Sequence, residues 1–118
     1  METDDPPTIV RKLKDSLQAS ACAFISRDGM VRFAEVPIGA YPETFGIMEA
    51  TILGAATTVN TELNRAPPDQ VIIEGRDSRT LIVRSGRKAF LVAVVDREAD
   101  VQHNLQELSR TAELLRSD

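Results

Sequence analysis

Cysteine, histidine and aromatic residues are scarce in this 118-residue sequence, and each scarcity excludes a class of protein. The single cysteine, Cys22, cannot form an intrachain disulfide framework. One histidine and one cysteine cannot supply the usual ligands of a zinc site. Because Cys22 stands among apolar residues, we interpret it as a buried and inert thiol. We therefore expect neither a metal site nor a reactive cysteine.

Long apolar runs, an excess of positive charge and a phosphate-binding motif are also missing. No apolar run approaches the roughly 20 residues of a membrane-spanning helix, and the acidic segment 1–7 does not resemble a secretory signal. The formal net charge of −4 argues against a nucleic-acid-binding protein. The sequence lacks a Gly-x-x-x-x-Gly-Lys-Ser/Thr loop for nucleotide phosphates. These absences favour a cytoplasmic protein without membrane insertion, nucleic-acid binding or a nucleotide site of this kind.

Candidates for catalytic residues are few, and each has a simpler interpretation. His103 falls in the first turn of a predicted helix, where a solvated side chain is expected. No serine has an evident general base nearby in the sequence. The arginines near the predicted turns are interpreted as solvated, although arginine can stabilise the transition state of a GTPase; they are Arg76, Arg79, Arg84 and Arg87. We expect no cofactor and no enzymatic activity.

The segment 43–63 is the longest periodic stretch of the chain, and its spacing predicts a helix. One apolar stripe recurs every three or four residues and is expected to cover a sheet; it comprises Phe45, Met48, Ile52, Ala55, Ala56, Val59 and Leu63. The opposite side carries small or β-branched residues and no charge: Ile47, Ala50, Gly54, Thr57, Thr58 and Thr61. A glycine inside a helix costs about 1 kcal/mol relative to alanine. Gly54 therefore suggests close approach by a second helix or a partner, with a solvated threonine-rich face as the alternative.

The rest of the chain predicts two terminal helices and five strands. An Asp-Gly pair predicts a hairpin at residues 28–29, and Asp100 is placed to cap the last helix. Residues 1–7 are expected to be a flexible lead-in, and residues 8–118 a single domain. The helices are predicted at 8–19 and 101–116, and the strands at 21–26, 30–36, 70–74, 80–85 and 89–95.

These elements predict an α+β fold with three layers. The two most apolar strands, the first and the fifth, are expected to lie side by side in the centre of the sheet. Hairpin connections then give a five-stranded antiparallel sheet of order 2-1-5-4-3. The helix over 43–63 is expected on one face and the two terminal helices on the other, because a sheet that is apolar on both faces needs helices on both.

The third strand presents an unusual edge, since Val71, Ile72 and Ile73 are consecutive and no lysine or proline interrupts them. We expect two copies of the chain to pair along this edge into one continuous sheet, forming a homodimer. The alternative is a short edge that the loop over 64–69 shields. The predicted dimer interface combines this edge with the small-residue side of the helix: Ile47, Ala50, Gly54, Thr57, Thr61, Val71, Ile72, Ile73 and Glu74.

Three motifs together resemble the roadblock/dynein light-chain family, which has a profilin-like architecture. They are Ala-Phe-Ile-Ser-Arg-Asp-Gly-Met-Val at 23–31, Ala-Thr-Ile-Leu-Gly-Ala-Ala at 50–56 and Val-Ile-Ile-Glu-Gly at 71–75. The resemblance covers residues 8–116 and implies a non-catalytic dimer that regulates or scaffolds a small Ras-like GTPase.

Three residues on the flank of the 43–63 helix are candidate contacts for such a GTPase: Thr51, Thr58 and Glu62. Two alternatives stay open, a small-molecule sensor and a purely structural dimerisation module. A polar pocket beneath the 43–63 helix would favour the sensor, whereas a filled core would favour the scaffold.

Overall fold

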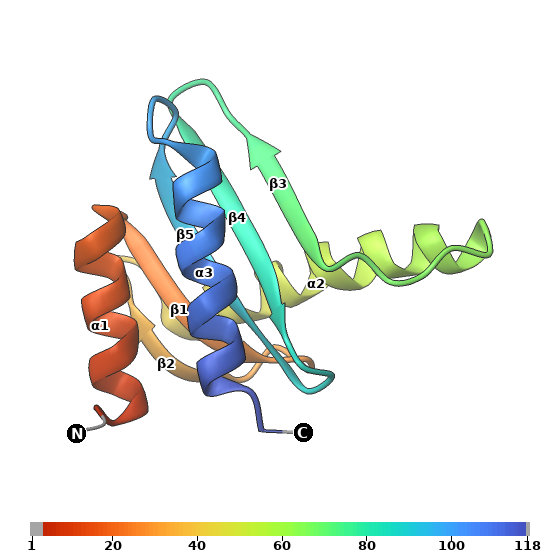
Figure 1. Ribbon diagram of the computed structural model, residues 1–118, viewed down its shortest axis with the longest axis horizontal. Coiled ribbons are helices and arrows are strands. Elements are labelled where there is room, and N and C mark those ends of the chain that lie inside the picture. The colour runs from red at the N-terminus through yellow and green to blue at the C-terminus, as the bar shows by residue number, and fades with distance from the viewer. Residues whose placement is uncertain (1–3, 118) are drawn as a thin grey trace.

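The computed structural model describes residues 4–117 and shows a five-stranded antiparallel sheet between two helical layers (Figure 1). The strand order is β2-β1-β5-β4-β3, which confirms the predicted topology. Each strand pairs antiparallel with its neighbours. The strands are β1 (Ala21–Ser26), β2 (Val31–Glu35), β3 (Gln70–Glu74), β4 (Ser78–Ser85) and β5 (Ala89–Asp96).

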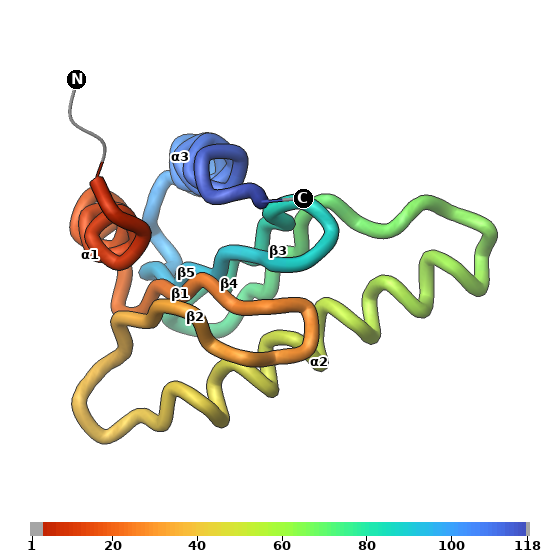
Figure 2. Tube along the Cα trace, turned by 90° about the horizontal axis from the view of Figure 1, so that it is seen from below, coloured from red at the N-terminus to blue at the C-terminus, as the bar shows by residue number. Residues whose placement is uncertain are grey.

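The helices divide between the two faces of the sheet as expected. Helices α1 (Pro6–Leu17) and α3 (Val101–Leu115) lie side by side on one face, and α2 (Pro42–Glu62) lies alone on the other (Figure 2). One apolar cluster lies between the sheet and helices α1 and α3, and a separate one lies between the sheet and α2. The predicted three-layer α+β fold is therefore confirmed. No helix within residues 4–117 combines the length and hydropathy that a bilayer-spanning segment needs.

Helix α1 begins at Pro6, two residues earlier than predicted. The side chain of Asp5 accepts a hydrogen bond from the Thr8 backbone N–H at 3.1 Å, and prolines fit the first turn because they lack an N–H. The helix ends at Leu17 because Gln18 adopts a left-handed conformation with φ 52°. Residues 5–7 of the predicted lead-in thus form the capped start of α1, and residues 1–3 lie outside the described part of the chain.

The cluster beneath α1 and α3 is the larger of the two. Cys22 is completely buried there, and burial raises the pKa of its thiol to about 12. A thiol with so high a pKa is protonated at neutral pH, which agrees with the prediction of an inert cysteine. The predicted cap of α3 is also present, since Asp100 accepts a hydrogen bond from the His103 backbone N–H at 3.1 Å.

Candidate protein-binding surface

Helix α2 faces the sheet with only part of the predicted stripe, since Phe45 and Ile52 pack against the apolar cluster beneath it. Its fully buried positions are Gly46, Glu49 and Leu53. The predicted stripe is wrong for four of its members, because Ala55 is exposed and Met48, Val59 and Leu63 keep 54%, 57% and 65% of their surface exposed. The helix is thus rotated about its axis relative to the prediction, and large apolar side chains point away from the core.

A close backbone contact accounts for this rotation. Gly46 lies against the turn between β1 and β2, where a Cβ atom would stand 2.6 Å from Val31 Cγ2 and 2.7 Å from the Gly29 carbonyl oxygen. Gly29 itself has φ +93°, a conformation that favours glycine. Only a helix that turns Gly46 toward this hairpin can approach so closely. Glu49 and Leu53, which follow at intervals of three and four residues, are then carried toward the sheet.

The rotation leaves two flanks of α2 exposed. At about 100° per residue, Ile47, Gly54, Thr58 and Thr61 form one side, which we call the small-residue flank. This side faces the β1–β2 turn, since a Cβ on Gly29 would stand 3.2 Å from Ile47 Cα and 3.5 Å from Ala50 Cβ. The other side, which we call the apolar flank, comprises the exposed Met48, Val59 and Leu63 and the half-buried Ile52, which also packs against the sheet.

The helix residues predicted for the dimer interface do not share one environment. Ala50 packs against the apolar cluster of its own sheet, and the Thr57 hydroxyl accepts a hydrogen bond from Arg84 Nη2 at 2.9 Å. These two residues are therefore turned inward, contrary to the prediction. Ile47, Gly54 and Thr61 are exposed, and a Cβ on Gly54 would meet no atom within 4 Å. The three candidate GTPase contacts are exposed as well: Thr51, Thr58 and Glu62.

Strand β3 is an open edge of the sheet, as predicted. Ile72 and Ile73 are 41% and 38% exposed, while Val71 is half-buried. The residues of the preceding loop are themselves exposed apart from the half-buried Pro68, so this loop does not cover the two isoleucines. The exposed Glu74 carboxylate accepts a 2.7 Å hydrogen bond from Arg79 Nε, and this bond, together with the charge of Arg79, lowers the pKa of Glu74.

One row of side chains on the α2 face of the sheet is left uncovered. The register places Ala21, Val94, Thr80 and Ile73 beside one another across β1, β5, β4 and β3. Ala21 is buried, but Val94 and Thr80 are only half-buried and Ile73 is exposed, so the row is open toward β3. The neighbouring row lies beneath α2, and its first three members have no exposed surface: Ala23, Val92, Ile82 and Val71.

The uncovered row and the apolar flank lie on the same side of the molecule. The row lies at the start of β1, opposite the β1–β2 turn, and therefore on the apolar side of α2. Figure 1 shows the strands continuing past α2, and both figures show the second half of α2 projecting beyond β3. We call this area the composite apolar surface; it comprises Met48, Ile52, Val59, Leu63, Ile73 and Val94.

Sequence reasoning did not identify Glu49, the one carboxylate buried under α2 in residues 4–117. Its side chain is 7% exposed, and its Oε1 atom has no hydrogen-bond partner. Burial raises the pKa of Glu49 to about 7. The available signal was its spacing, because Glu49 lies three residues after Gly46 and four before Leu53. We assign it no chemical role, since no group of metal-ligating side chains occurs within the described residues.

Two of the arginines predicted to be solvated instead hold loops. Arg79 donates hydrogen bonds to Glu74, to the Arg97 carbonyl oxygen and, at 3.4 Å, to the Ala99 carbonyl oxygen. Arg84 reaches from β4 to α2 and to the loop that follows it. Both side chains are engaged within the subunit, so neither extends freely toward the transition state of a bound GTPase.

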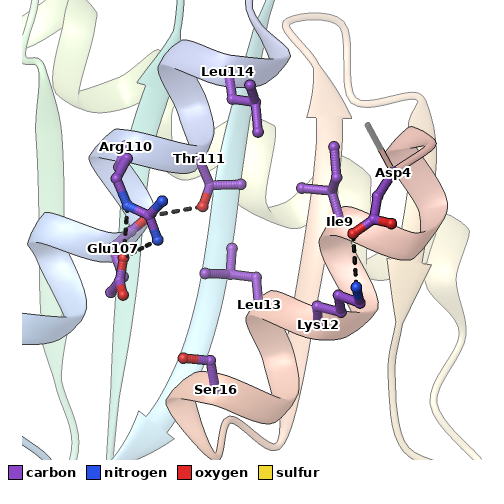
Figure 3. Close-up of a pocket in the computed structure, with 9 residues that line it drawn as sticks. All are labelled: Asp4, Ile9, Lys12, Leu13, Ser16, Glu107, Arg110, Thr111 and Leu114. Carbon is purple, nitrogen blue, oxygen red and sulfur yellow. Dashed lines mark hydrogen bonds and ion pairs between the residues drawn. The ribbon is translucent and has the colours of Figure 1, made fainter. Parts of the chain in front are cut away.

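The enclosed space beneath α2 is filled, which disfavours the sensor alternative. Apolar side chains occupy it together with Glu49: Ala23, Ile25, Leu53, Ile82, Phe90 and Val92. A groove of about 400 Å³ lies beside the start of α2, against the β1–β2 turn. A shallow groove of about 300 Å³ lies between α1 and α3 (Figure 3). Its charged side chains already pair with each other, Lys12 with Asp4 at 2.8 Å and Arg110 with Glu107 at 2.6 Å.

Comparison with known proteins defines the fold. No family model matches the sequence. Two uncharacterized proteins of Methanocaldococcus jannaschii are similar to it. MJ1340 is 27% identical over 93 residues, which cover 79% of this chain and 81% of the relative. MJ0714 is 29% identical over 77 residues, which cover 65% of this chain and 64% of the relative.

Solved structures match over almost the whole chain. A roadblock/LC7 domain from Streptomyces avermitilis superimposes with a TM-score of 0.85 at 15% identity, covering 96% of both chains. The gliding protein MglB of Thermus thermophilus gives 0.81 at 19% identity and covers 97% of this chain and 91% of its own. Profilin II of Acanthamoeba castellanii gives 0.69 at 18% identity, covering 94% and 96%. The fold is that of the roadblock/LC7 domain, which confirms the architecture implied by the sequence motifs.

Proposed function

We propose that this protein is a cytoplasmic, non-catalytic homodimer that binds a small Ras-like GTPase as a regulator or scaffold. The observation that carries this proposal is the composite apolar surface beside the open edge of β3. Large contiguous apolar patches on soluble proteins mark sites of protein association. An apolar edge strand without protective charges or bulges favours strand pairing with another chain. The resemblance to roadblock domains is what suggests that the other partner, besides a second copy of the chain, is a small GTPase.

In the proposed dimer, β3 pairs with β3 of the second copy around a two-fold axis. The residues of this contact are Val71, Ile72, Ile73 and Glu74, as predicted from the sequence. The projecting half of α2 then extends over the partner's sheet, where the row containing Val94 is uncovered. A two-fold interface uses the same patch on both copies, so each helix covers the other copy's row. The apolar flank, rather than the small-residue flank, is thereby buried.

This arrangement leaves the small-residue flank of both helices accessible to a third protein. Gly54 has open space around its Cα atom, which allows close approach of another backbone. Thr51, Thr58 and Glu62 lie along the same exposed side and supply hydroxyl and carboxylate groups at its margin. A GTPase bound there would contact both copies near the axis. Differential affinity for the GTP and GDP states would shift the population of its switch-loop conformations.

A binding titration tests the function directly. The purified protein is titrated against a Ras-like GTPase encoded by the same genome, loaded either with a GTP analogue or with GDP. We expect saturable binding, with a higher affinity for one of the two states. Binding of neither state by a well-folded dimer would contradict the GTPase role and leave a purely structural module. Specific binding of free GTP by this chain alone would also contradict the proposal, because it would show that the chain has a nucleotide site of its own.

A further inference from the structure

We propose that Arg84 is a positioning residue that sets the direction of the projecting half of α2. Its guanidinium group bridges three parts of the chain. From β4, Nη2 donates a 2.9 Å hydrogen bond to Thr57 Oγ1 on α2, and Nε donates a 2.8 Å hydrogen bond to the Pro68 carbonyl oxygen in the loop before β3. The backbone N–H of Arg84 donates to the Asp69 carbonyl oxygen at 3.1 Å. The significance of this direction for binding rests on the proposed function.

The projecting half of α2 has little other attachment to its own subunit. Leu53 is its last fully buried residue, and the main contacts of α2 with the sheet are with β1 and β2. After Leu53, the positions nearest the sheet are only half-buried: Ala56, Thr57 and Asn60. Segments with few buried apolar contacts open locally at low free-energy cost. A polar attachment at Thr57 therefore has a disproportionate effect on where the end of the helix points.

The attachment continues along the helix in both directions. Thr57 Oγ1 donates its own hydrogen to the Leu53 carbonyl oxygen at 2.8 Å, which fixes the lone pair that Arg84 uses. At the end of the helix, Asn60 Nδ2 donates to the Ala66 carbonyl oxygen at 2.9 Å, and the Arg65 backbone N–H donates to the Asn60 carbonyl oxygen at 2.7 Å. The helix end and the loop thus form one unit, which Arg84 holds at Thr57 and at Pro68.

The chemistry suits arginine specifically. The guanidinium group is planar and presents several N–H donors in a fixed fork, so one side chain bonds two acceptors that differ in position. Both acceptors are neutral oxygen atoms, so these contacts are hydrogen bonds and not ion pairs. Lysine would bring one ammonium group on a flexible stem to the same region and would not reproduce the fork. Position 84 therefore requires arginine for geometry rather than for charge.

Hydrogen–deuterium exchange of the full-length chain tests this role. The variants are Arg84→Met, which keeps the alkyl packing, Thr57→Val, which removes the acceptor, and Thr57→Ser, which retains it. Each variant is made in the wild-type protein and in a Val59→Lys protein. Val59→Lys places a charge on the apolar flank and is designed to prevent dimerisation, because contacts with a second copy would slow the exchange of the α2 amides. For the loss of a hydrogen bond at this site we expect about tenfold faster exchange of the amides at 54–62 in Arg84→Met and Thr57→Val. The amides at 43–50 should be unaffected, and Thr57→Ser should resemble its parent.

Two outcomes would overturn the proposal. Unchanged exchange at 54–62 in Arg84→Met would show that the helix end holds its position without the guanidinium group. Equal acceleration at 43–50 and 54–62 would show a general loss of stability instead of a local one. The exchange is also measured on single subunits, in the Val59→Lys background. If the wild-type protein neither dimerises nor binds a GTPase, the proposed function is refuted, but the role of Arg84 is still tested.

Discussion

At the scale of single residues, Glu49 is the side chain whose environment conflicts most with its chemistry. A carboxylate removed from water without a hydrogen-bond partner is destabilised relative to its protonated form. The shift in its pKa, from 4.5 to about 7, has burial as its cause. The protonated side chain is therefore the form favoured between α2 and the sheet. Stability should therefore depend on the pH at which the protein is studied.

The first prediction concerns the replacement Glu49→Gln. Between pH 4.5 and pH 7 the folded protein retains the Glu49 proton while the unfolded chain releases it, so this residue makes stability fall as pH rises. At about 1.4 kcal/mol per pH unit, the loss amounts to roughly 3 kcal/mol. Urea unfolding at pH 4.5 and pH 8 should show this decline in the wild type and not in the variant. Glu43→Gln controls for net charge, and parallel pH profiles of wild type and Glu49→Gln would refute the account.

The second prediction contrasts two glycines of α2. Gly46→Ala should destabilise the fold by about 1–3 kcal/mol, because the new methyl group would overlap Val31 Cγ2 and the Gly29 carbonyl oxygen. Gly54→Ala should stabilise it by about 0.5–1 kcal/mol, since that position is open and alanine is the better helix former. Chemical unfolding at one fixed protein concentration measures both. Shifts of the same sign would show that the close contact at Gly46 does not determine the rotation of the helix.

At the scale of elements, α2 shows that apolar periodicity predicts a helix more reliably than it predicts which face of the helix is buried. Apolar spacing correctly predicts its existence and its ends to within a residue, from 43–63 against Pro42–Glu62. It does not predict the face, because the helix is apolar on an exposed flank and carries Gly46 and Glu49 toward the sheet. Choosing the most apolar stripe as the buried one assumes that the subunit is complete. A helix that serves a second molecule breaks that assumption.

The third prediction separates the two flanks with adjacent residues. Val59→Lys places a charge on the apolar flank and should convert the dimer to monomer at micromolar concentration, because burying an unpaired charge is costly. Thr58→Lys, about 100° away on the helix, should leave the dimer intact and weaken GTPase binding. Sedimentation and the titration described above measure the two effects. If Thr58→Lys gave monomer and Val59→Lys did not, the dimer contact would lie on the small-residue flank, as the sequence alone predicts.

At the scale of the whole molecule, strand order was accessible from the sequence because the most apolar strands had to be central. β5 and β1 satisfy this expectation, with Cys22, Ala23, Ile25 and Phe90 to Ala93 completely buried. The binding surface was less accessible. Ile73 was identified from its own strand, whereas Val94, which lies two strands away in the same row, belongs to a strand that reads as core throughout. Only the position of α2 across the sheet shows that this end of β5 is uncovered.

The pairing of β1 with β5 also has a consequence for biosynthesis. The backbone N–H of Ser20 donates to the Val94 carbonyl oxygen, so the sheet joins segments that are far apart in the sequence. Contacts between distant segments are slow to form because they require closure of a long loop. A nascent chain that has not reached residue 89 possesses two separate hairpins and no strand to unite them. The domain therefore acquires its core only after β5 has been synthesised, and until then the apolar faces of the two hairpins are exposed to aggregation.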